Sequence, residues 1–277
     1  MGTTGQPGAC SDLRRTPPRI GGWSILGGRV VVEALCRAPV DFVGIDAQHG
    51  FFAFDEAAVA VQIANLCGTR VLVRVPVDQI GWIPRYLDAG ADGIVLAMTG
   101  SAADAERAVH MSLYQPHGRR SYGGGKRNGV GDPPGAAARR EQQTPEIIAM
   151  IETAGALAEL NEIVATPGLA GAWIGPVDLG LALGRPHPLP PGDQVWRDAL
   201  RQVVGSCQDA GIRPGMFAVG GEDAREWLAA GFLDVVLSSD IALLRRAFHE
   251  QIARARAPVT DADPICAVQS ADPYAGR

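Results

Sequence analysis

Short apolar runs recur along the chain, and each is followed by a stretch in which apolar residues return at the spacing of an α-helix. Runs such as VLVRV and GIVLAM are apolar at almost every position, which is typical of strands covered on both faces in a parallel sheet. One of the helical stretches, SAADAERAVHMSL, opens on Ser101, a favourable cap residue. The predicted strands are 21–26, 42–47, 70–75, 93–98, 146–152, 170–176, 213–218 and 234–240.

This alternation of strand and helix favours a (β/α)8 barrel, a fold of about 250 residues. An open doubly wound sheet is the alternative, but it would place a glycine-rich phosphate turn after the first strand, and SILGGRV does not match GxGxxG. We predict one barrel domain over residues 20–256, between flexible tails at 1–19 and 257–277 that lack periodicity. The long break at 113–145 is rich in Gly, Pro and Arg, which is typical of functional or disordered loops.

Composition and charge exclude several classes of protein. The net charge of −5 disfavours a nucleic-acid binder, and no apolar run reaches the roughly 20 residues of a membrane span. The N-terminus has no apolar stretch of the kind found in a secretory signal. The five cysteines form no CxxC pair, and Cys36, Cys67 and Cys207 are predicted to be core residues. These features predict a reduced, cytoplasmic protein.

Polar residues stand where several predicted strands end, which is where the active site of a barrel lies. They are Asp46 at the end of strand two with Gln48 and His49 just beyond it, Arg74 at the end of strand three, Glu152 at the end of strand five, Asp178 after strand six, and Ser238, Ser239 and Asp240 at the end of strand eight. Taken singly they have ordinary explanations, because Glu152 or Asp178 could cap a helix and Asp46 could anchor a turn.

The combination is more informative than its members. Glu152 and Asp178 follow successive strands, so a barrel would make them neighbours, and two adjacent carboxylates repel unless a proton or a cation lies between them. Without nearby cysteines, such a pair favours Mg²⁺ or Mn²⁺ in an open site with positions left for water and substrate. Arg74 could then stabilise a developing oxyanion, and His49 could act as a general acid or base.

Seven segments together resemble the metal-dependent class II pyruvate aldolases of the HpcH/HpaI (4-hydroxy-2-oxoheptanedioate aldolase) family. They are DFVGIDAQHG, VLVRVP, RYLDAGADGIVLAM, YQPHGRRSYGGG, MIETAGALAELNEI, GLAGAWIGPVDLGLALG and AGFLDVVLSSDIALLRRA. The resemblance covers about residues 20–250, and its IET and GPxDL motifs are fairly specific. Both motifs also recur in relatives such as citrate lyase β-like proteins.

The resemblance implies a modified barrel whose last helix packs on, or is swapped with, a partner subunit in a hexamer or trimer. It implies that Glu152 and Asp178 ligate a divalent ion (Mg²⁺, Mn²⁺ or Co²⁺) and that pyruvate chelates this ion. Arg74 would hold the keto oxygen and steady the enolate.

The same resemblance assigns the rest of the site. Residues Gly175, Pro176 and Val177 would bind the substrate carboxylate through backbone amides. His49, supported by Asp88, would exchange protons through water, and Asp46 would shape the same region. The implied reaction joins pyruvate or a related 2-oxo acid to an aldehyde, or cleaves the product.

Two departures from the family pattern leave the reaction open. Gln48 stands where the family usually has Glu, and Met150 stands where it often has Gln, so a hydrogen-bonding group near the pyruvate end is missing. The same enolate could therefore serve decarboxylation of oxaloacetate or a hydroxymethyl-type transfer. A CoA-ester lyase is disfavoured because the basic residues outside 113–145 are a poor match for the CoA phosphates. A non-catalytic metabolite-binding barrel is disfavoured because it would not need Glu152, Asp178, Arg74 and His49 together. The basic residues Arg119, Arg120, Lys126 and Arg127 could recognise an anionic acceptor or form a solvated loop.

Overall fold

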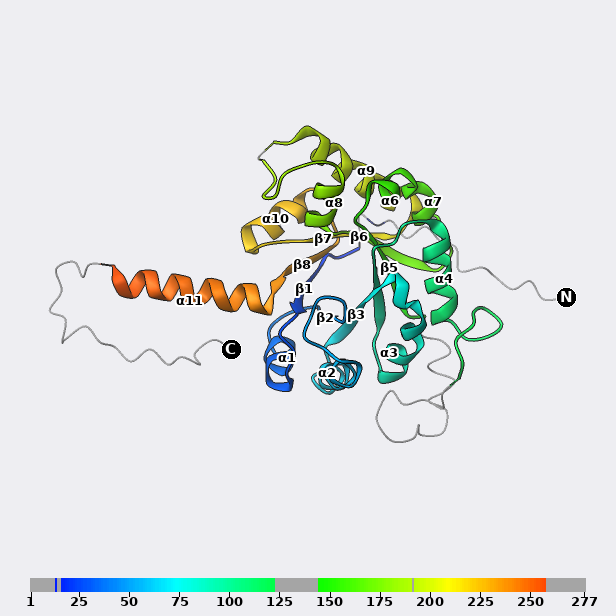
Figure 1. Ribbon diagram of the computed structural model, residues 1–277, viewed down its shortest axis with the longest axis horizontal. Coiled ribbons are helices and arrows are strands. Elements are labelled where there is room, and N and C mark those ends of the chain that lie inside the picture. The colour runs from blue at the N-terminus through cyan, green and yellow to red at the C-terminus, as the bar shows by residue number, and fades with distance from the viewer. Residues whose placement is uncertain (1–12, 14–15, 123–143, 191, 258–277) are drawn as a thin grey trace. The chain divides into compact units, whose positions relative to one another are not determined.

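Eight parallel strands form a closed barrel in the computed structural model of this chain, which describes residue 13 and residues 16–122, 144–190 and 192–257 (Figure 1). Each strand pairs with the next along the chain, and the eighth pairs back onto the first. The strands are β1 (Arg19–Ser24), β2 (Phe42–Asp46), β3 (Arg70–Pro76), β4 (Gly93–Ala97), β5 (Glu146–Ile151), β6 (Leu169–Ile174), β7 (Arg213–Phe217) and β8 (Asp234–Ser239). The predicted (β/α)8 fold class is confirmed.

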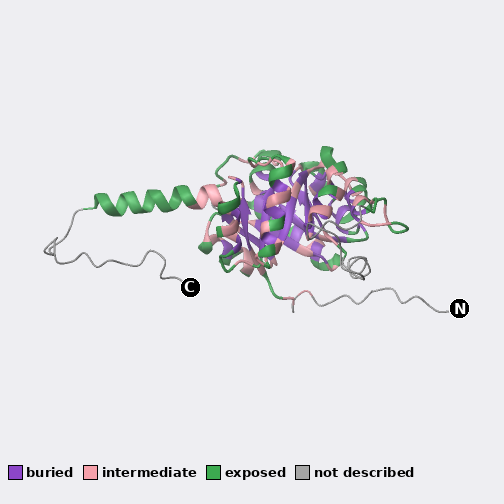
Figure 2. Cartoon of the chain, turned by 90° about the horizontal axis from the view of Figure 1, so that it is seen from below, coloured by how far each residue is buried: buried purple, intermediate pink, exposed green. Residues whose placement is uncertain are grey.

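The helices from α1 to α10 surround the barrel and cover the outward faces of its strands, and the buried residues gather in the strands and on the helix faces turned toward them (Figure 2). In the described part of the chain the helices are α1 (Arg29–Cys36), α2 (Phe54–Leu66), η2 (Val77–Trp82), α3 (Ile83–Ala89), α4 (Ala102–Ser112), α6 (Ala154–Ala158), α7 (Leu160–Val164), α8 (Pro176–Ala182), α9 (Gln194–Ala210), α10 (Gly221–Ala229) and α11 (Asp240–Arg256). The predicted cap of α4 is confirmed, because the Ser101 hydroxyl accepts a hydrogen bond from the Asp104 N–H.

Aromatic side chains fill the barrel interior because glycines on neighbouring strands leave room for them. A Cβ at Gly44 would lie 2.0 Å from the Trp23 ring, and one at Gly215 would lie 2.1 Å from the Trp173 ring. Such distances do not occur between real atoms, so any larger residue at either glycine would displace an indole. The two tryptophans belong to the buried apolar cluster inside the barrel.

A layer of ion pairs closes the amino-terminal end of the barrel. The buried Asp234 carboxylate accepts hydrogen bonds from Arg19, Arg213 and the Trp173 indole, and Arg19 also pairs with Glu146. Burial alone would raise the pKa of Asp234, but the two guanidinium groups outweigh burial and hold that pKa below its usual value. Because this end serves stability, the opposite end is left for chemistry.

The chain divides into two compact units, Met1–Ile241 and Ala242–Arg277. The first contains the barrel. The described part of the second is the rest of α11, which has no buried residue and exposes Leu244, Phe248 and Ile252 at helical spacing. Packing of this helix on a partner subunit stays a prediction. Lys126 and Arg127 lie outside the described residues, as do most residues of the two predicted tails.

Two further predictions concern thiols and membranes. Burial raises the pKa of the Cys36 thiol to about 11 and that of Cys207 to about 12, which agrees with inert core residues, while Cys67 is half-buried against the core. The other two cysteines lie outside the described residues. Among the helices that are described, none has the length and apolar character needed to span a bilayer.

Candidate active site

Asp46, the last residue of β2, organises one side of the site. Its fully buried carboxylate accepts hydrogen bonds from Arg74 (Nε to Oδ1, 3.0 Å), the Trp23 indole (3.2 Å) and the backbone N–H groups of Gln48 and His49. Burial alone would raise the pKa of Asp46, but the Arg74 guanidinium outweighs burial and lowers it. Asp46 therefore anchors the turn after β2 and also fixes the positions of Arg74 and of the backbone at His49.

Glu152, directly after β5, is 3% exposed, and both of its carboxylate oxygens are confined. Oε2 accepts a 2.7 Å hydrogen bond from the Met98 N–H, and Oε1 lies where a Cβ on Gly175 would be only 2.3 Å away. Met98 has φ 55°, a left-handed conformation that is uncommon outside glycine and is often found at functional sites. Thr153, not Glu152, supplies the side-chain cap of α6.

Asp178 lies in the first turn of α8 and is exposed. It does not cap this helix, because the N-cap position is Gly175 and no side-chain cap bond forms. Burial raises the pKa of the Glu152 carboxyl, the charge of Asp178 raises it further, and Arg74 and His49 act in the opposite direction. Glu152, at the carboxyl end of β5, therefore lies within electrostatic range of Asp178, Arg74 and His49.

The donor set at this position fits a hard divalent ion. The described residues contain no cluster of three or more His, Cys, Asp or Glu side chains able to hold a metal. Glu152 and Asp178 would be the two protein donors. Two carboxylates that repel each other, one of them buried, are stabilised when a cation lies between them. A site with only two protein ligands leaves coordination positions open to water and substrate.

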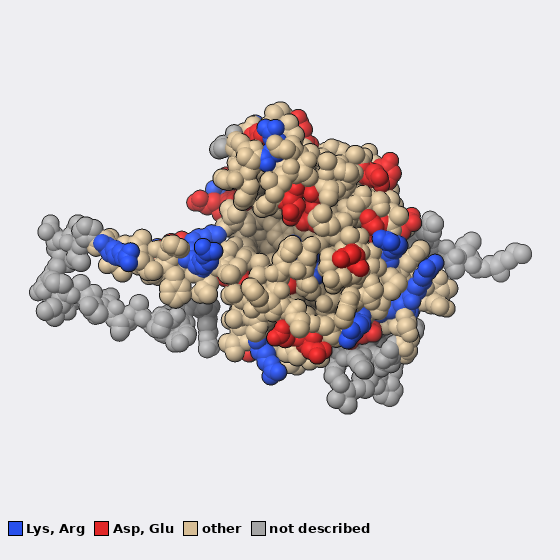
Figure 3. Space-filling model, viewed as in Figure 1, with Lys and Arg blue, Asp and Glu red and all other residues tan. Residues whose placement is uncertain are grey.

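The three residues predicted to bind the substrate carboxylate differ in whether their backbone N–H is free to donate a hydrogen bond. Pro176 has no N–H, and the Gly175 N–H is bonded to the Ile151 carbonyl (3.4 Å). The Val177 N–H, in the first turn of α8, has no intrahelical acceptor. Figure 3 shows a hollow between α8 and the elements around α1 and α2, with acidic side chains at its edge.

Asp88 lies in a different environment. Its carboxylate accepts a 2.6 Å hydrogen bond from Arg120, whose guanidinium lies 4.6 Å from the centre of the Tyr114 ring. Among the described residues, the Asp88 side chain forms its ion pair with Arg120 and has no hydrogen bond with His49. Its support of His49 stays a prediction.

Sequence reasoning missed Trp23 and Met98. Trp23 stands in an apolar run and has the appearance of an ordinary core residue, while its indole N–H bonds a carboxylate 23 positions further on. Met98 contributes through its backbone, so its side-chain type carries no signal. Of the two departures from the family pattern, Met150 is buried in the barrel interior with Trp23, and Gln48 is half-buried beside Asp46.

A closed (β/α)8 barrel that gathers two carboxylates, an arginine and a histidine at the carboxyl ends of its strands defines an enzyme. The arginine and the carboxylates suit a reaction in which negative charge develops on an oxygen atom.

Comparison with known proteins defines the enzyme further. The sequence description of the HpcH/HpaI aldolase/citrate lyase family matches residues 19–247. A hydroxypyruvate/pyruvate aldolase from Rhizorhabdus wittichii is 36% identical over 87% of this chain and 95% of its own, and a 4-hydroxy-2-oxovalerate aldolase from Rhodococcus jostii is 30% identical over 82% and 88%. A crystal structure of a family member from Burkholderia cenocepacia superposes with a TM-score of 0.81 at 26% identity, covering 90% of this chain and 98% of that one. The chain belongs to the HpcH/HpaI aldolase/citrate lyase family and is a carbon–carbon lyase.

Proposed function

We propose that this protein is a divalent-metal-dependent aldolase that cleaves a 4-hydroxy-2-oxo acid to pyruvate, or a related 2-oxo acid, and an aldehyde, or forms it from them. The proposal is supported chiefly by the environment of Glu152, a buried carboxyl whose pKa is affected by the charges of Arg74, Asp178 and His49. The aldolase names of the relatives from R. wittichii and R. jostii support the same substrate class.

A metal ion held by Glu152 and Asp178 would supply positive charge next to the oxygens of the 2-oxo acid. Arg74 carries a second positive charge that cannot be titrated away, because the pKa of a guanidinium is far above neutrality. Its hydrogen bonds to Asp46 hold the guanidinium in one orientation before substrate arrives. Such a fixed charge stabilises the enolate without reorganisation during the reaction.

Cleavage then requires two proton transfers and the breaking of the C3–C4 bond. The proton leaves the C4 hydroxyl, the C3–C4 bond breaks, the aldehyde departs, and C3 of the enolate takes up a proton to give the 2-oxo acid. His49 is the proposed acid or base for the proton at the hydroxyl oxygen, and its backbone is positioned by Asp46. The Val177 N–H is the proposed donor to the substrate carboxylate.

Methyl proton exchange of pyruvate tests this proposal without knowledge of the aldehyde. The protein is incubated with pyruvate in D₂O and Mg²⁺ or Mn²⁺, and the methyl signal is followed by NMR before and after addition of EDTA. We expect metal-dependent loss of the signal, abolished by Glu152→Ala, Asp178→Ala or Arg74→Ala. The matched control for Asp178 is Glu222→Gln, since Glu222 is also an exposed acid in the first turn of a helix.

Each outcome favours a different function. Exchange that persists in EDTA would rule out metal dependence, and the absence of exchange under any condition would favour a non-catalytic binding barrel. His49→Ala should mainly impair the aldehyde half of the reaction. Unchanged aldol cleavage in this variant would remove His49 from its proposed role.

A further inference from the structure

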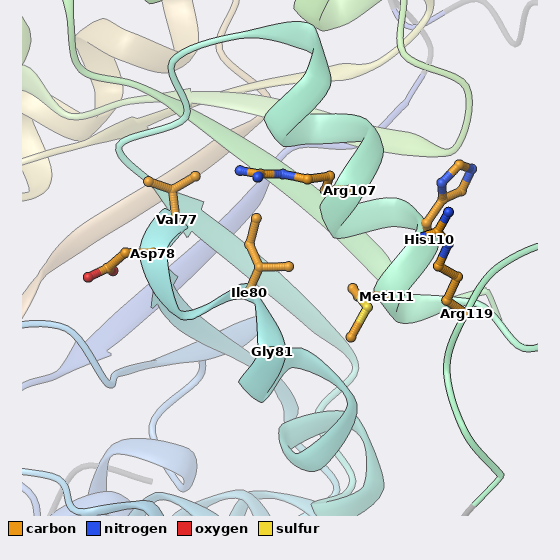
Figure 4. Close-up of a pocket in the computed structure, with 8 residues that line it drawn as sticks. All are labelled: Val77, Asp78, Ile80, Gly81, Arg107, His110, Met111 and Arg119. Atoms are coloured by element: carbon orange, nitrogen blue, oxygen red, sulfur yellow. The ribbon is translucent and has the colours of Figure 1, made fainter.

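A pocket of about 500 Å³ lies on the flank of the barrel, between η2 and α4 (Figure 4). Its volume falls within the range of sites that bind small molecules. None of its lining residues belongs to the group of Asp46, Arg74, Glu152 and Asp178. The lining residues are Val77, Asp78, Ile80, Gly81, Arg107, His110, Met111 and Arg119.

The walls of this pocket combine apolar side chains with cations. Ile80 from η2 and Met111 from α4 face the space between the two elements, and Arg107 extends across it from α4 (Figure 4). Arg119 and His110 lie together at the other end of the pocket (Figure 4). A ligand with a short apolar body and an anionic group would match both kinds of surface.

Arg119 is held in place by its backbone, and its charge is not neutralised nearby. Its N–H donates a 2.6 Å hydrogen bond to the His110 carbonyl, which ties the loop back onto α4. The preceding Gly118 is packed so tightly that a Cβ there would lie 2.3 Å from the Leu113 carbonyl oxygen. No acidic side chain among the described residues pairs with Arg119, whereas its neighbour Arg120 is neutralised by Asp88.

Arg107 keeps donors for a ligand although it already has one partner. Its Nη2 contacts Asp104 at 2.7 Å, and a guanidinium has five N–H groups in all. The pocket's own acid, Asp78, points away from the Arg107 guanidinium (Figure 4). Basic side chains also gather on the surface over α3 and α4 (Figure 3). The two arginines therefore place positive charge at two positions along the pocket, and each can donate to an anionic group.

We propose that this pocket binds a small organic dianion, with Arg107 and Arg119 contacting its anionic groups and Ile80 and Met111 contacting its carbon body. A dicarboxylate and a phosphate monoester share this chemistry. Planar guanidinium groups can bind either one through two hydrogen bonds. The proposal does not depend on the aldolase reaction.

Isothermal titration calorimetry of the full chain at low ionic strength tests it, with succinate and inorganic phosphate as probes. The protein is first treated with a chelator, so that no metal contributes to binding. Arg107→Gln and Arg119→Gln remove one cation each. Arg201→Gln is the matched control, because Arg201 forms the same i,i+3 pair with Asp198 at 2.6 Å and is 66% exposed, against 63% for Arg107.

We expect saturable binding of at least one probe, weakened about tenfold in each pocket variant and unchanged in Arg201→Gln. Tighter binding of succinate would identify a carboxylate ligand, and tighter binding of phosphate a phosphate ester. The proposal is overturned by absence of saturable binding, by equal affinities in all four proteins, or by the same loss in Arg201→Gln. Circular dichroism melting of each variant establishes that the losses do not come from unfolding.

Discussion

Gly175 can be used to test whether the position of Glu152 determines metal binding. In Gly175→Ala, the new Cβ would lie 2.3 Å from Oε1, 2.6 Å from Cγ and 2.9 Å from Cδ of Glu152. These three contacts are all shorter than van der Waals distance, and Glu152 is confined from the other side by the Met98 N–H. The backbone of Gly175 is not strained, with φ −86° and ψ 97°, so the effect of the substitution is a displacement of the carboxylate.

The expected change in the free energy of unfolding of Gly175→Ala is the sum of two opposing contributions. Overpacking of a buried site costs about 1–3 kcal/mol, while replacing glycine at a compatible backbone position stabilises by roughly 0.4–1 kcal/mol through the unfolded chain. We therefore expect a net loss of about 1–2 kcal/mol in the free energy of unfolding. Mn²⁺ affinity should fall about tenfold or more, because a displaced ligand no longer meets the ion.

Urea denaturation and calorimetric Mn²⁺ titration of the same samples measure both effects. Gly205→Ala is the matched control, because Gly205 lies inside α9 and a Cβ there meets no atom within 4 Å. This control should gain up to about 1 kcal/mol and leave Mn²⁺ affinity unchanged. A folded Gly175→Ala protein with wild-type Mn²⁺ affinity would refute the reasoning about Glu152.

Three further substitutions probe the contacts around the two ends of the barrel. Trp23→Phe removes the indole donor to buried Asp46 and should lower the free energy of unfolding, measured in urea, by about 1–2 kcal/mol. An unchanged midpoint of the urea transition would contradict this. Arg74 lowers the pKa of Asp46 in the folded protein. The pair therefore stabilises the fold fully above the pKa of an unfolded Asp, about 4, and this stability is lost as the pH falls through the lower folded-state pKa. The difference in unfolding free energy between wild type and Asp46→Asn should therefore shrink on acidification, and a constant difference from pH 7 to pH 2 would rule out the pair as its source. Asp234→Asn leaves Arg213 without its carboxylate partner and Arg19 with Glu146 alone, and it should cost about 3 kcal/mol at pH 7. Exposed Asp198→Asn should cost less than about 0.5 kcal/mol in the same urea assay.

The arrangement of strands and helices was determined by local patterns in the sequence. Each strand is a short apolar run, and its ends fall within two residues of the prediction, because burial on both faces demands apolar side chains at consecutive positions. The resemblance to a known family and the polar residues after the strands named Glu152, Asp178, Arg74 and His49. Closure of the barrel then brings residues at equivalent strand ends to one place.

Only the tertiary structure decided how these groups are held. The indole of Trp23 reaches Asp46, the strained backbone of Met98 reaches Glu152, and Gly175 leaves the space that Glu152 occupies. None of these contacts lies within one element, so periodicity cannot reveal them. The pairing of Asp88 with Arg120 is of the same kind, because it joins residues 32 positions apart. Local sequence determines which side chains a strand presents, but hydrogen-bond partners are set by which strands and loops the closed barrel makes adjacent.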